Sequence, residues 1–345
     1  MLGIQQEKYS PGVREMACRL SLNEAFVPAC ETLARTAQLS MCHSTLRELV
    51  QREGRRAESA IREGHYGPNF TSEDCTARTV ISGADGVMVP TVTEEQKSKR
   101  RVTEQRKRRE ANRRSTRRPG RPKRGSDGDY KEFKLASFYD PDKSHRYAVG
   151  TRGNHEALGR LLRREAKKIQ IHRAKVKYSV TDGAEWIAKQ YQIQLPMLDE
   201  NILDYYHLRD HVIAVSHVLY GEGTPKAKAW REDMMGYVWN QGSLVMLDRL
   251  GSYVRRHRGG PKHEALKSLR QYVGKRVAMT DYPTFRAAGY DCGSGPTESF
   301  CGCLTRRLKG RGMRWDQDNA EAIMALGGLY YSRLWDDYWP KQRAA

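Results

Sequence analysis

Residues 78–90 read RTVISGADGVMVP, and with them the chain changes from a helical to a strand-like pattern. β-Branched residues, which favour strands, stand on both sides of the centre of this stretch: Val80, Ile81, Val87 and Val89. At the centre is Asp85-Gly86, a dipeptide that usually marks a turn. We therefore expect a strand here, with a carboxylate where an apolar run meets a glycine.

Two later stretches also carry a carboxylate close to a glycine. In KVKYSVTDGAEWI (175–187) a strand pattern runs into a turn and a helix, and Asp182 stands at the junction. In GSGPTESF (293–300), Glu298 stands near the start of a helix. Taken singly, such residues are more often turn residues or surface residues favoured by the helix dipole. Their common setting makes all three candidate site residues.

The stretch between these motifs predicts a mixed sheet. EFKLASFYD (132–140) and HRYAVGT (145–151) read as strands joined by a turn, and a basic amphipathic helix follows over 154–172. Strand, strand, strand, helix, strand is the order that builds an RNase H-like sheet, in which three antiparallel strands are followed by parallel ones with crossover helices. Residues 212–290 read as helical throughout.

The N-terminal part predicts three short helices within residues 11–64. The last of them carries a largely basic face: Arg47, Gln51, Arg52, Arg55 and Arg56. Such a unit resembles a helix-turn-helix, whose last helix enters the major groove of DNA. A helical bundle with a solvated charged face is an equally good interpretation, and both stay open.

A basic stretch interrupts the strands. Residues 97–124 contain 15 Lys or Arg among 28 residues, and prolines near the end exclude a continuous helix there. The part before Ser115 is compatible with a charged helix. The segment PGRPK resembles an AT-hook core, although a polybasic linker that binds phosphates without sequence preference is the safer interpretation. The candidate DNA contacts in it are Arg117, Arg118, Arg121 and Lys123.

The composition points to a polyanionic partner. The chain has 345 residues, 38% of them hydrophobic, and 61 Lys plus Arg against 41 Asp plus Glu give a net charge of +20. Nucleic acid is the leading candidate. No apolar run approaches the ~18 residues of a membrane span and no secretory signal follows Met1, so we expect no membrane partner.

Seven scattered cysteines favour a reducing compartment over a disulfide framework, and we expect a cytoplasmic, nucleoid-associated protein. Only Cys301 and Cys303 are close in sequence. They lack a second cysteine pair, so small packing residues in a helix are a better interpretation than a zinc site.

These elements give an α/β fold class: an RNase H-like mixed sheet with flanking helices, an all-helical insertion before the last catalytic helix, and an N-terminal helix-turn-helix-like domain. The expected domains are a helical DNA-binding domain (1–70), a first core segment with a basic insertion at 95–128 (78–211), the helical insertion (212–290) and a second core segment (291–339).

In such a sheet the strand that carries Asp85 and the strand that ends at Asp182 are neighbours, so residues 97 positions apart can meet. Glu298 would come from a helix packed on the same sheet. Three converging carboxylates suit two cations roughly 4 Å apart that cleave phosphodiesters, and Mg²⁺ prefers oxygen ligands. Three other carboxylates compete on sequence alone: Asp140, Asp142 and Glu185.

These motifs resemble those of the ISKra group of insertion-sequence transposases. GSGPTES followed by a helix and RRLKGRGMRW (306–315) is similar to the last catalytic motif of that group, and the match extends over residues 272–299. DGVMV, TDGAEWI and ILDYYHLRDHV (202–212) fit the same pattern. The resemblance covers roughly residues 78 to 339.

The resemblance implies a DDE-type enzyme whose metal ligands are Asp85, Asp182 and Glu298, holding two Mg²⁺ ions that Mn²⁺ can replace. His207, three residues after Asp204, would position the scissile phosphate or the displaced strand; a structural histidine bonded to Asp204 or to a carbonyl is the alternative. Substrate phosphates would be held by Arg306, Arg307, Lys309, Arg311 and Arg314. Trp315 is expected in the core.

The function implied is transposition: binding of terminal inverted repeats in double-stranded DNA, cleavage that frees a 3′ hydroxyl, and attack of that hydroxyl on target DNA. Pairing two ends requires at least a homodimer on DNA. Two other functions fit the same residues, a catalytically inactive DNA-binding descendant and a structure-selective endonuclease with the same fold.

Overall fold

The computed structural model describes residues 8–110 and 125–344 of the chain. Three helices lead it, as the sequence predicted: α1 (Pro11–Ser21), α2 (Phe26–Ala37) and α3 (His43–Arg62). Pro11 occupies the first turn of α1, and the hydroxyl of Ser10 accepts a hydrogen bond from the backbone N–H of Val13 at 3.4 Å. This pairing of an N-cap oxygen with a proline explains where the first helix begins.

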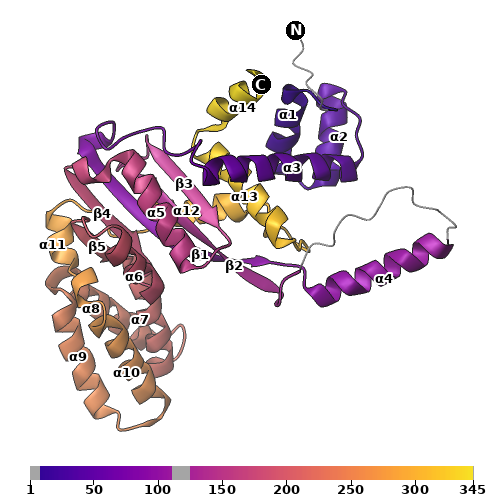
Figure 1. The fold of residues 1–345 in the computed structure, drawn as a ribbon. Coiled ribbons are helices and arrows are strands. Elements are labelled where there is room, and N and C mark those ends of the chain that lie inside the picture. The colour runs from indigo at the N-terminus through magenta and orange to yellow at the C-terminus, as the bar shows by residue number, and fades with distance from the viewer. Residues whose placement is uncertain (1–7, 111–124, 345) are drawn as a thin grey trace.

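A five-stranded mixed sheet forms the centre of the molecule (Figure 1). Its strands are β1 (Thr79–Pro90), β2 (Tyr130–Tyr139), β3 (Arg146–Thr151), β4 (Val176–Thr181) and β5 (Glu200–Leu203). In space they follow the order β3-β2-β1-β4-β5. The first three pair antiparallel, and β4 and β5 run parallel to β1. The mixed sheet predicted from the sequence, three antiparallel strands followed by parallel ones, is confirmed.

Helices cover both faces of this sheet. On one face lie the crossover helices α5 (His155–Ile169) and α6 (Glu185–Gln194), and the hydroxyl of Ser82 on β1 contacts Tyr191 of α6 at 2.8 Å. On the other face α12 (Gly295–Thr305) packs against Gly83, the next residue of β1. Because side chains alternate along a strand, Asp85 projects toward the face that α12 covers.

The connection between β5 and α12 is helical. It comprises α7 (Tyr205–Tyr220), α8 (Pro225–Gln241), α9 (Ser243–Arg256), α10 (Gly260–Gly274) and the short α11 (Tyr282–Ala287). These helices surround a hydrophobic cluster that continues into β4 and β5, and they extend from the sheet as a bundle (Figure 1). Among the described residues, no helix is both long and apolar enough to cross a membrane.

A second hydrophobic cluster joins the N-terminal helices to the sheet and to the last helices, α13 (Gln317–Tyr331) and α14 (Trp335–Ala344). The helices α3 and α13 cross closely at Gly54, where a Cβ atom would lie 2.5 Å from the carbonyl oxygen of Ala322. One side of α3 is therefore covered by α13 at Gly54. Arg47, Arg52, Arg55 and Arg56 of α3 are exposed.

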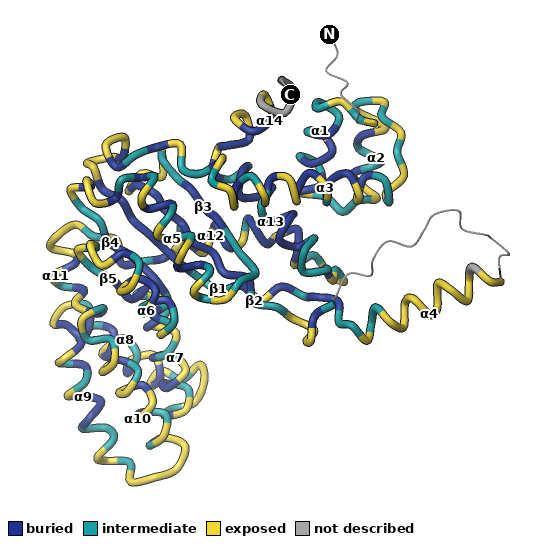
Figure 2. Tube along the Cα trace, in the orientation of Figure 1, coloured by how far each residue is buried: buried dark blue, intermediate teal, exposed yellow. Residues whose placement is uncertain are grey.

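The remaining helix, α4 (Glu94–Glu110), projects from the body of the molecule (Figure 1). Lys97 anchors its base through an ion pair with Asp316 at 2.5 Å. From Ser98 onward its described side chains are exposed (Figure 2). A charged helix at the start of the basic stretch is thus confirmed. The predicted DNA contacts further on lie outside the described residues: Arg117, Arg118, Arg121 and Lys123.

Candidate active site

The pairing of β1 with β4 runs toward two of the predicted carboxylates. Thr79 pairs with Val176 and Ser82 with Ser179, so partners differ by 97 in residue number. The same difference separates Asp85 from Asp182 (182 minus 85). Both side chains are half-buried, and the charge of Asp182 acts directly on the carboxyl of Asp85. The sheet therefore brings these residues together.

A tight turn fixes Asp182. Its Oδ1 accepts a hydrogen bond from the backbone N–H of Ala184 at 2.8 Å, and Gly183 adopts a φ of +74°, which favours glycine. The end of α10 holds this turn from outside. Tyr272 donates its hydroxyl to the carbonyl of Asp182 at 3.3 Å, and Arg276 donates from Nε to the carbonyl of Gly183 at 2.9 Å. The helical bundle thus supports one of the candidate ligands.

Opposing effects act on Asp85. Burial raises the pKa of its carboxyl, and the nearby charge of Asp182 raises it further. Hydrogen bonds from the Cys301 thiol and the Gly86 backbone N–H lower it, as does the charge of Lys309. Burial dominates, and the net shift is upward. The Asp85 carboxylate is therefore partly desolvated when ionised, and a cation bound beside it would stabilise the ionised form.

This shift predicts a measurable effect of pH on stability. With a pKa raised in the folded state, Asp85 retains its proton after the unfolded chain has lost it, so stability falls as the pH rises through this interval and stays lower above it. Asp85→Asn in metal-free protein should avoid that loss. We expect the urea concentration at the midpoint of unfolding, relative to that of the wild type, to increase as the pH rises from 4 to 7. The exposed Asp233→Asn serves as control, and an equal gain in that variant would contradict the prediction.

Glu298 reaches the same region through α12. Thr297 fits against Gly83 on β1, and its hydroxyl contacts that of Ser137 on β2 at 2.9 Å. Glu298, the next residue, is exposed and accepts a hydrogen bond from Ser294 Oγ at 3.2 Å. Its charge acts on the thiol of Cys301, which also bonds Asp85. The buried thiol of Cys301 is thus within electrostatic reach of the first and third candidate carboxylates.

Sequence reasoning missed this contribution of Cys301. It treated the residue as a small packing residue, because no second cysteine pair suggested chemistry. The signal was its position three residues after Glu298, which places both on one side of a helix. Cys303, two residues further on, has no such relation to the carboxylates among the contacts described.

Asp204 connects the start of α7 to the start of α12. It is buried, and its carboxylate accepts hydrogen bonds from the backbone N–H of His207 at 2.9 Å and from both the N–H and the hydroxyl of Ser294 at 2.5 Å. Its own N–H donates to the carbonyl of Thr181 at 2.7 Å. A single side chain thus fixes two helix starts beside the end of β4.

His207 hydrogen-bonds to Asp204 through its backbone N–H, and no bond from its imidazole ring to Asp204 is found among the described contacts. That ring is half-exposed and packs edge-on against His211, with centroids 5.1 Å apart. His211 in turn stacks on Tyr272 at 4.0 Å, and Arg276 lies 3.9 Å above the ring of Tyr272. His207 is therefore the outermost member of a stack that ends at the Asp182 turn.

Removal of the Asp204 carboxylate should destabilise the protein strongly. Asp204→Ala leaves the buried N–H of Ser294 without its acceptor and removes the cap of α7, so we expect a loss of about 2–4 kcal/mol. Chemical denaturation of the purified protein measures it. Asp210→Ala, on the exposed side of α7, is the matched control and should stay within about 0.5 kcal/mol of the wild type. Similar losses in the two variants would refute this role.

The predicted cations after α12 divide into two groups. Arg306, Lys309, Arg311 and Arg314 are exposed. Arg307 is buried, donates from Nε to the carbonyl of Ser21 at 3.0 Å, and lies over the rings of Phe26 and Trp315. Burial lowers its pKa to about 10. Arg307 is thus a structural residue here, and Trp315 lies in the core as predicted.

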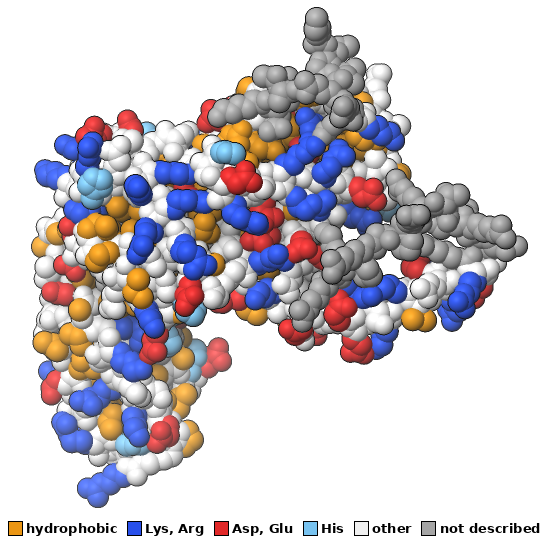
Figure 3. Space-filling view, viewed as in Figure 1, with side chains coloured by type: hydrophobic (Ala, Val, Ile, Leu, Met, Phe, Trp, Pro, Cys, Tyr) orange, Lys and Arg blue, Asp and Glu red, His pale blue; other side chains and the backbone are white. Residues whose placement is uncertain are grey.

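Arg314 and Arg47 share one surface feature. Both line a groove of about 720 Å³ bounded by α2, α3, the base of α4 and the segment before α13. Arg314 also pairs with Asp129 at 2.5 Å. Figure 3 shows Lys and Arg side chains distributed widely over the visible face, with acidic side chains among them.

The competing carboxylates lie elsewhere. Asp140 and Asp142 follow β2, beside the beginning of β1, whereas Asp85 lies near the middle of this strand. Glu185 is exposed and pairs with Lys275 at 2.7 Å. The structure therefore separates all three from the pair of aspartates.

The chain matches no known protein-family model and no curated protein sequence. Among solved structures it is similar to the Drosophila P element transposase strand transfer complex, with a TM-score of 0.39 and 12% sequence identity over 94% of this chain and 92% of that chain. A likeness of this size decides neither the function nor the residues that perform it.

Proposed function

We propose that the chain is a DDE-type transposase with an RNase H-like core, of the kind its motifs resemble in the ISKra group. The observation that carries the proposal is the parallel pairing of β1 with β4, whose last pair, Ser82 with Ser179, precedes Asp85 and Asp182 by three residues on each chain segment. The α12 face of the same sheet holds the helix of Glu298. The strand order and directions agree with this class of core.

The three carboxylates fit a magnesium centre. They offer oxygen ligands, and Asp85 combines burial with a neighbouring negative charge, a combination that a bound cation relieves. Asp85, Asp182 and Glu298 would hold two Mg²⁺ ions, or Mn²⁺ in their place. Bound there, the metal would activate a water or a 3′ hydroxyl and stabilise the leaving oxygen. The thiol of Cys301 and the turn at Gly183 keep the aspartates in place for this.

Exposed cations next to these carboxylates suit the DNA backbone. Arg306, Lys309 and Arg311 follow α12 directly, and the charge of Lys309 already acts on Asp85. Arg314 and Arg47, in their shared groove, would extend the contact toward the N-terminal helices. His207 would contact the DNA strand nearest the Asp182 turn. Such phosphate contacts position the duplex without reading its sequence.

The proposed partners are the terminal inverted repeats of the element and target DNA, bound by a homodimer or a larger assembly. Double-stranded DNA in the cytoplasm, associated with the nucleoid, would be the setting for the reaction. The exposed arginines of α3, Arg47 among them, would serve the helix-turn-helix role.

The test uses purified full-length protein, Mg²⁺ and a duplex that contains the coding region with its flanking sequences. A transposase yields new 3′-hydroxyl ends at the element boundaries and joined products with a second duplex. Binding without cleavage in Mg²⁺ or Mn²⁺ would indicate an inactive DNA-binding descendant. Cleavage of branched DNA without joining would indicate a structure-selective endonuclease. Either of these outcomes overturns the proposal.

A further inference from the structure

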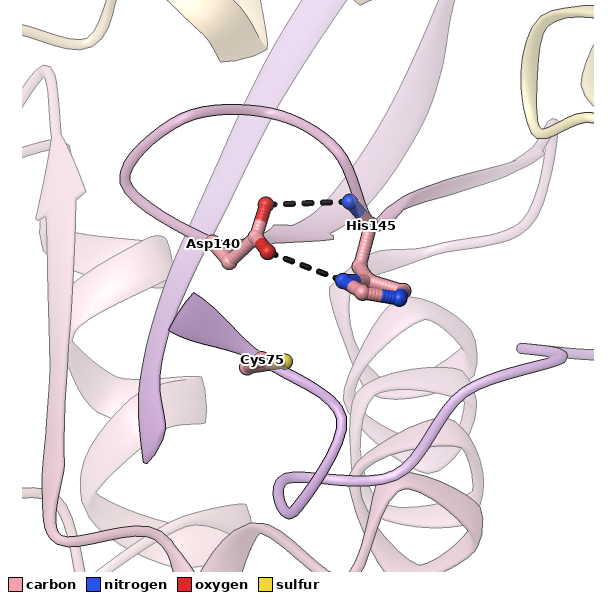
Figure 4. A group of neighbouring side chains, drawn as sticks. All are labelled: Cys75, Asp140 and His145. Atoms are coloured by element: carbon pink, nitrogen blue, oxygen red, sulfur yellow. Dashed lines mark hydrogen bonds and ion pairs between the residues drawn. The ribbon is translucent and has the colours of Figure 1, made fainter. Parts of the chain in front are cut away.

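A second group of metal-ligating side chains lies beside the beginning of β1, away from Asp85. Cys75, Asp140 and His145 place their sulfur, oxygen and nitrogen ligand atoms within 4.8 Å of one another. Figure 4 shows Asp140 and His145 at the two ends of the turn between β2 and β3, and Cys75 on the segment that leads to β1. Two chain segments meet here, and neither has a role in the proposed reaction.

Burial and hydrogen bonds hold these side chains in place. Asp140 is fully buried and Cys75 is nearly so. The backbone N–H of His145 donates to Asp140 Oδ1 at 3.0 Å, and His145 Nδ1 lies 2.9 Å from Asp140 Oδ2. The imidazole also packs on Phe70, with ring centroids 5.4 Å apart. The ligand atoms are thus held by backbone and core contacts before any ion arrives.

The balance of charge favours a cation. Thr76 Oγ1 contacts both Asp140 Oδ2 at 3.4 Å and Asp142 Oδ2 at 2.8 Å, so two carboxylates meet at one hydroxyl. Asp74 is close enough to act electrostatically on both Cys75 and His145. Three carboxylates therefore surround one imidazole, an excess of negative charge that a divalent ion would neutralise.

We propose that Cys75, Asp140 and His145 bind a structural Zn²⁺ ion, with Asp142 or water as the fourth ligand. Sulfur, imidazole nitrogen and carboxylate oxygen form a donor set that zinc accepts, whereas Mg²⁺ takes oxygen alone. Tetrahedral bonds of about 2.0–2.3 Å require shifts of about 1 Å from the present positions. His145 is 34% exposed in its side chain, which gives the ion a path of entry.

Such an ion would fasten the N-terminal helices to the sheet. Cys75 belongs to the connection between α3 and β1, while Asp140 and His145 belong to the β2–β3 turn. The carbonyl of Ser144 in the same turn accepts a hydrogen bond from Arg333, after α13, at 2.9 Å. The site therefore stands where three parts of the fold converge, and its effect would be on stability.

The experiment titrates metal-free full-length protein with Co²⁺, whose bonds to thiolate give a charge-transfer absorption band. We expect one equivalent to bind with that band, Zn²⁺ to displace it, and Zn²⁺ to raise the melting temperature. Cys75→Ser should lose the band, and His145→Gln should weaken binding by about 100-fold or more, since even outer-shell partners are worth 10–100-fold. The exposed Cys42→Ser is the matched control and should behave as the wild type.

Three outcomes would overturn the zinc proposal: no thiolate band, a band that persists in Cys75→Ser, or one that disappears only in Cys301→Ser. If Cys75→Ser does not fold, His145→Gln alone decides, because its side chain is partly exposed. Asp182→Asn should keep the band, which separates this site from the proposed magnesium centre.

Discussion

Replacing Asp182 by Asn is expected to lower DNA cleavage and joining by at least about 10²- to 10³-fold. The substitution keeps the size of the side chain and the acceptor for the Ala184 N–H, so the turn at Gly183 survives. What disappears is one negative charge beside Asp85. Cleavage rates at several Mg²⁺ concentrations, together with DNA affinity by gel shift, measure the effect. Affinity should remain that of the wild type, because the exposed cations are untouched.

Glu185→Gln is the matched control for this substitution. Glu185 lies three residues away, at the start of α6, and its carboxylate pairs with Lys275 at 2.7 Å instead of facing Asp85. We expect full cleavage and joining in this variant. Equal activity of the two variants would remove Asp182 from the reaction, and a large loss in Glu185→Gln would transfer the role to the competing carboxylate.

Gly83→Ala should impair both stability and activity. A Cβ atom at this position would lie 2.8 Å from Thr297 Cβ and 3.0 Å from Ser137 Oγ, and the contact with Thr297 Oγ1 is closer still. Thr297 is buried, so α12 has to move outward and Glu298 moves with it. Overpacking of this kind costs about 1–3 kcal/mol. Urea unfolding gives the first effect, and cleavage at a temperature where the variant is folded gives the second.

Gly302→Ala tests the same helix without the clash. Gly302 is exposed on α12 and a Cβ atom there meets nothing within 4 Å. Because alanine favours helices over glycine, we expect a gain of roughly 0.5–1 kcal/mol and unchanged cleavage. If Gly83→Ala retained wild-type stability and rate, the close packing of α12 on β1 would not matter for the site.

The parts of the fold that the sequence predicted well depend on local patterns. β-Branched runs and turn dipeptides located β1 and β4, and the motif spacing placed Asp85 and Asp182 on neighbouring strands. The structure adds the register of β1 against β4, in which Ser82 pairs with Ser179, three residues before each aspartate. The sequence does not predict this register, because the alignment of parallel strands depends on how the crossover helices pack between them.

The errors of sequence reasoning concern residues whose partners are distant in the chain. Arg307 looked like its exposed neighbours, yet Phe26 and Ser21, from the N-terminal helices, bury its guanidinium. Gly54 gave a readable signal: glycine inside a helix costs about 1 kcal/mol, so its presence suggests a close crossing.

The hydrogen bonds of Asp204 also have a mechanical consequence. They join the first turn of α7, which begins the helical bundle, to Ser294, which precedes the helix of Glu298. Tyr272 of α10 and Arg276, just after this helix, donate hydrogen bonds to the turn of Asp182. A tilt of the bundle therefore pulls on two of the three candidate ligands at once. A duplex that pressed against the bundle would therefore shift the Asp182 turn and the start of α12 together, and Asp204 would be the point that couples them.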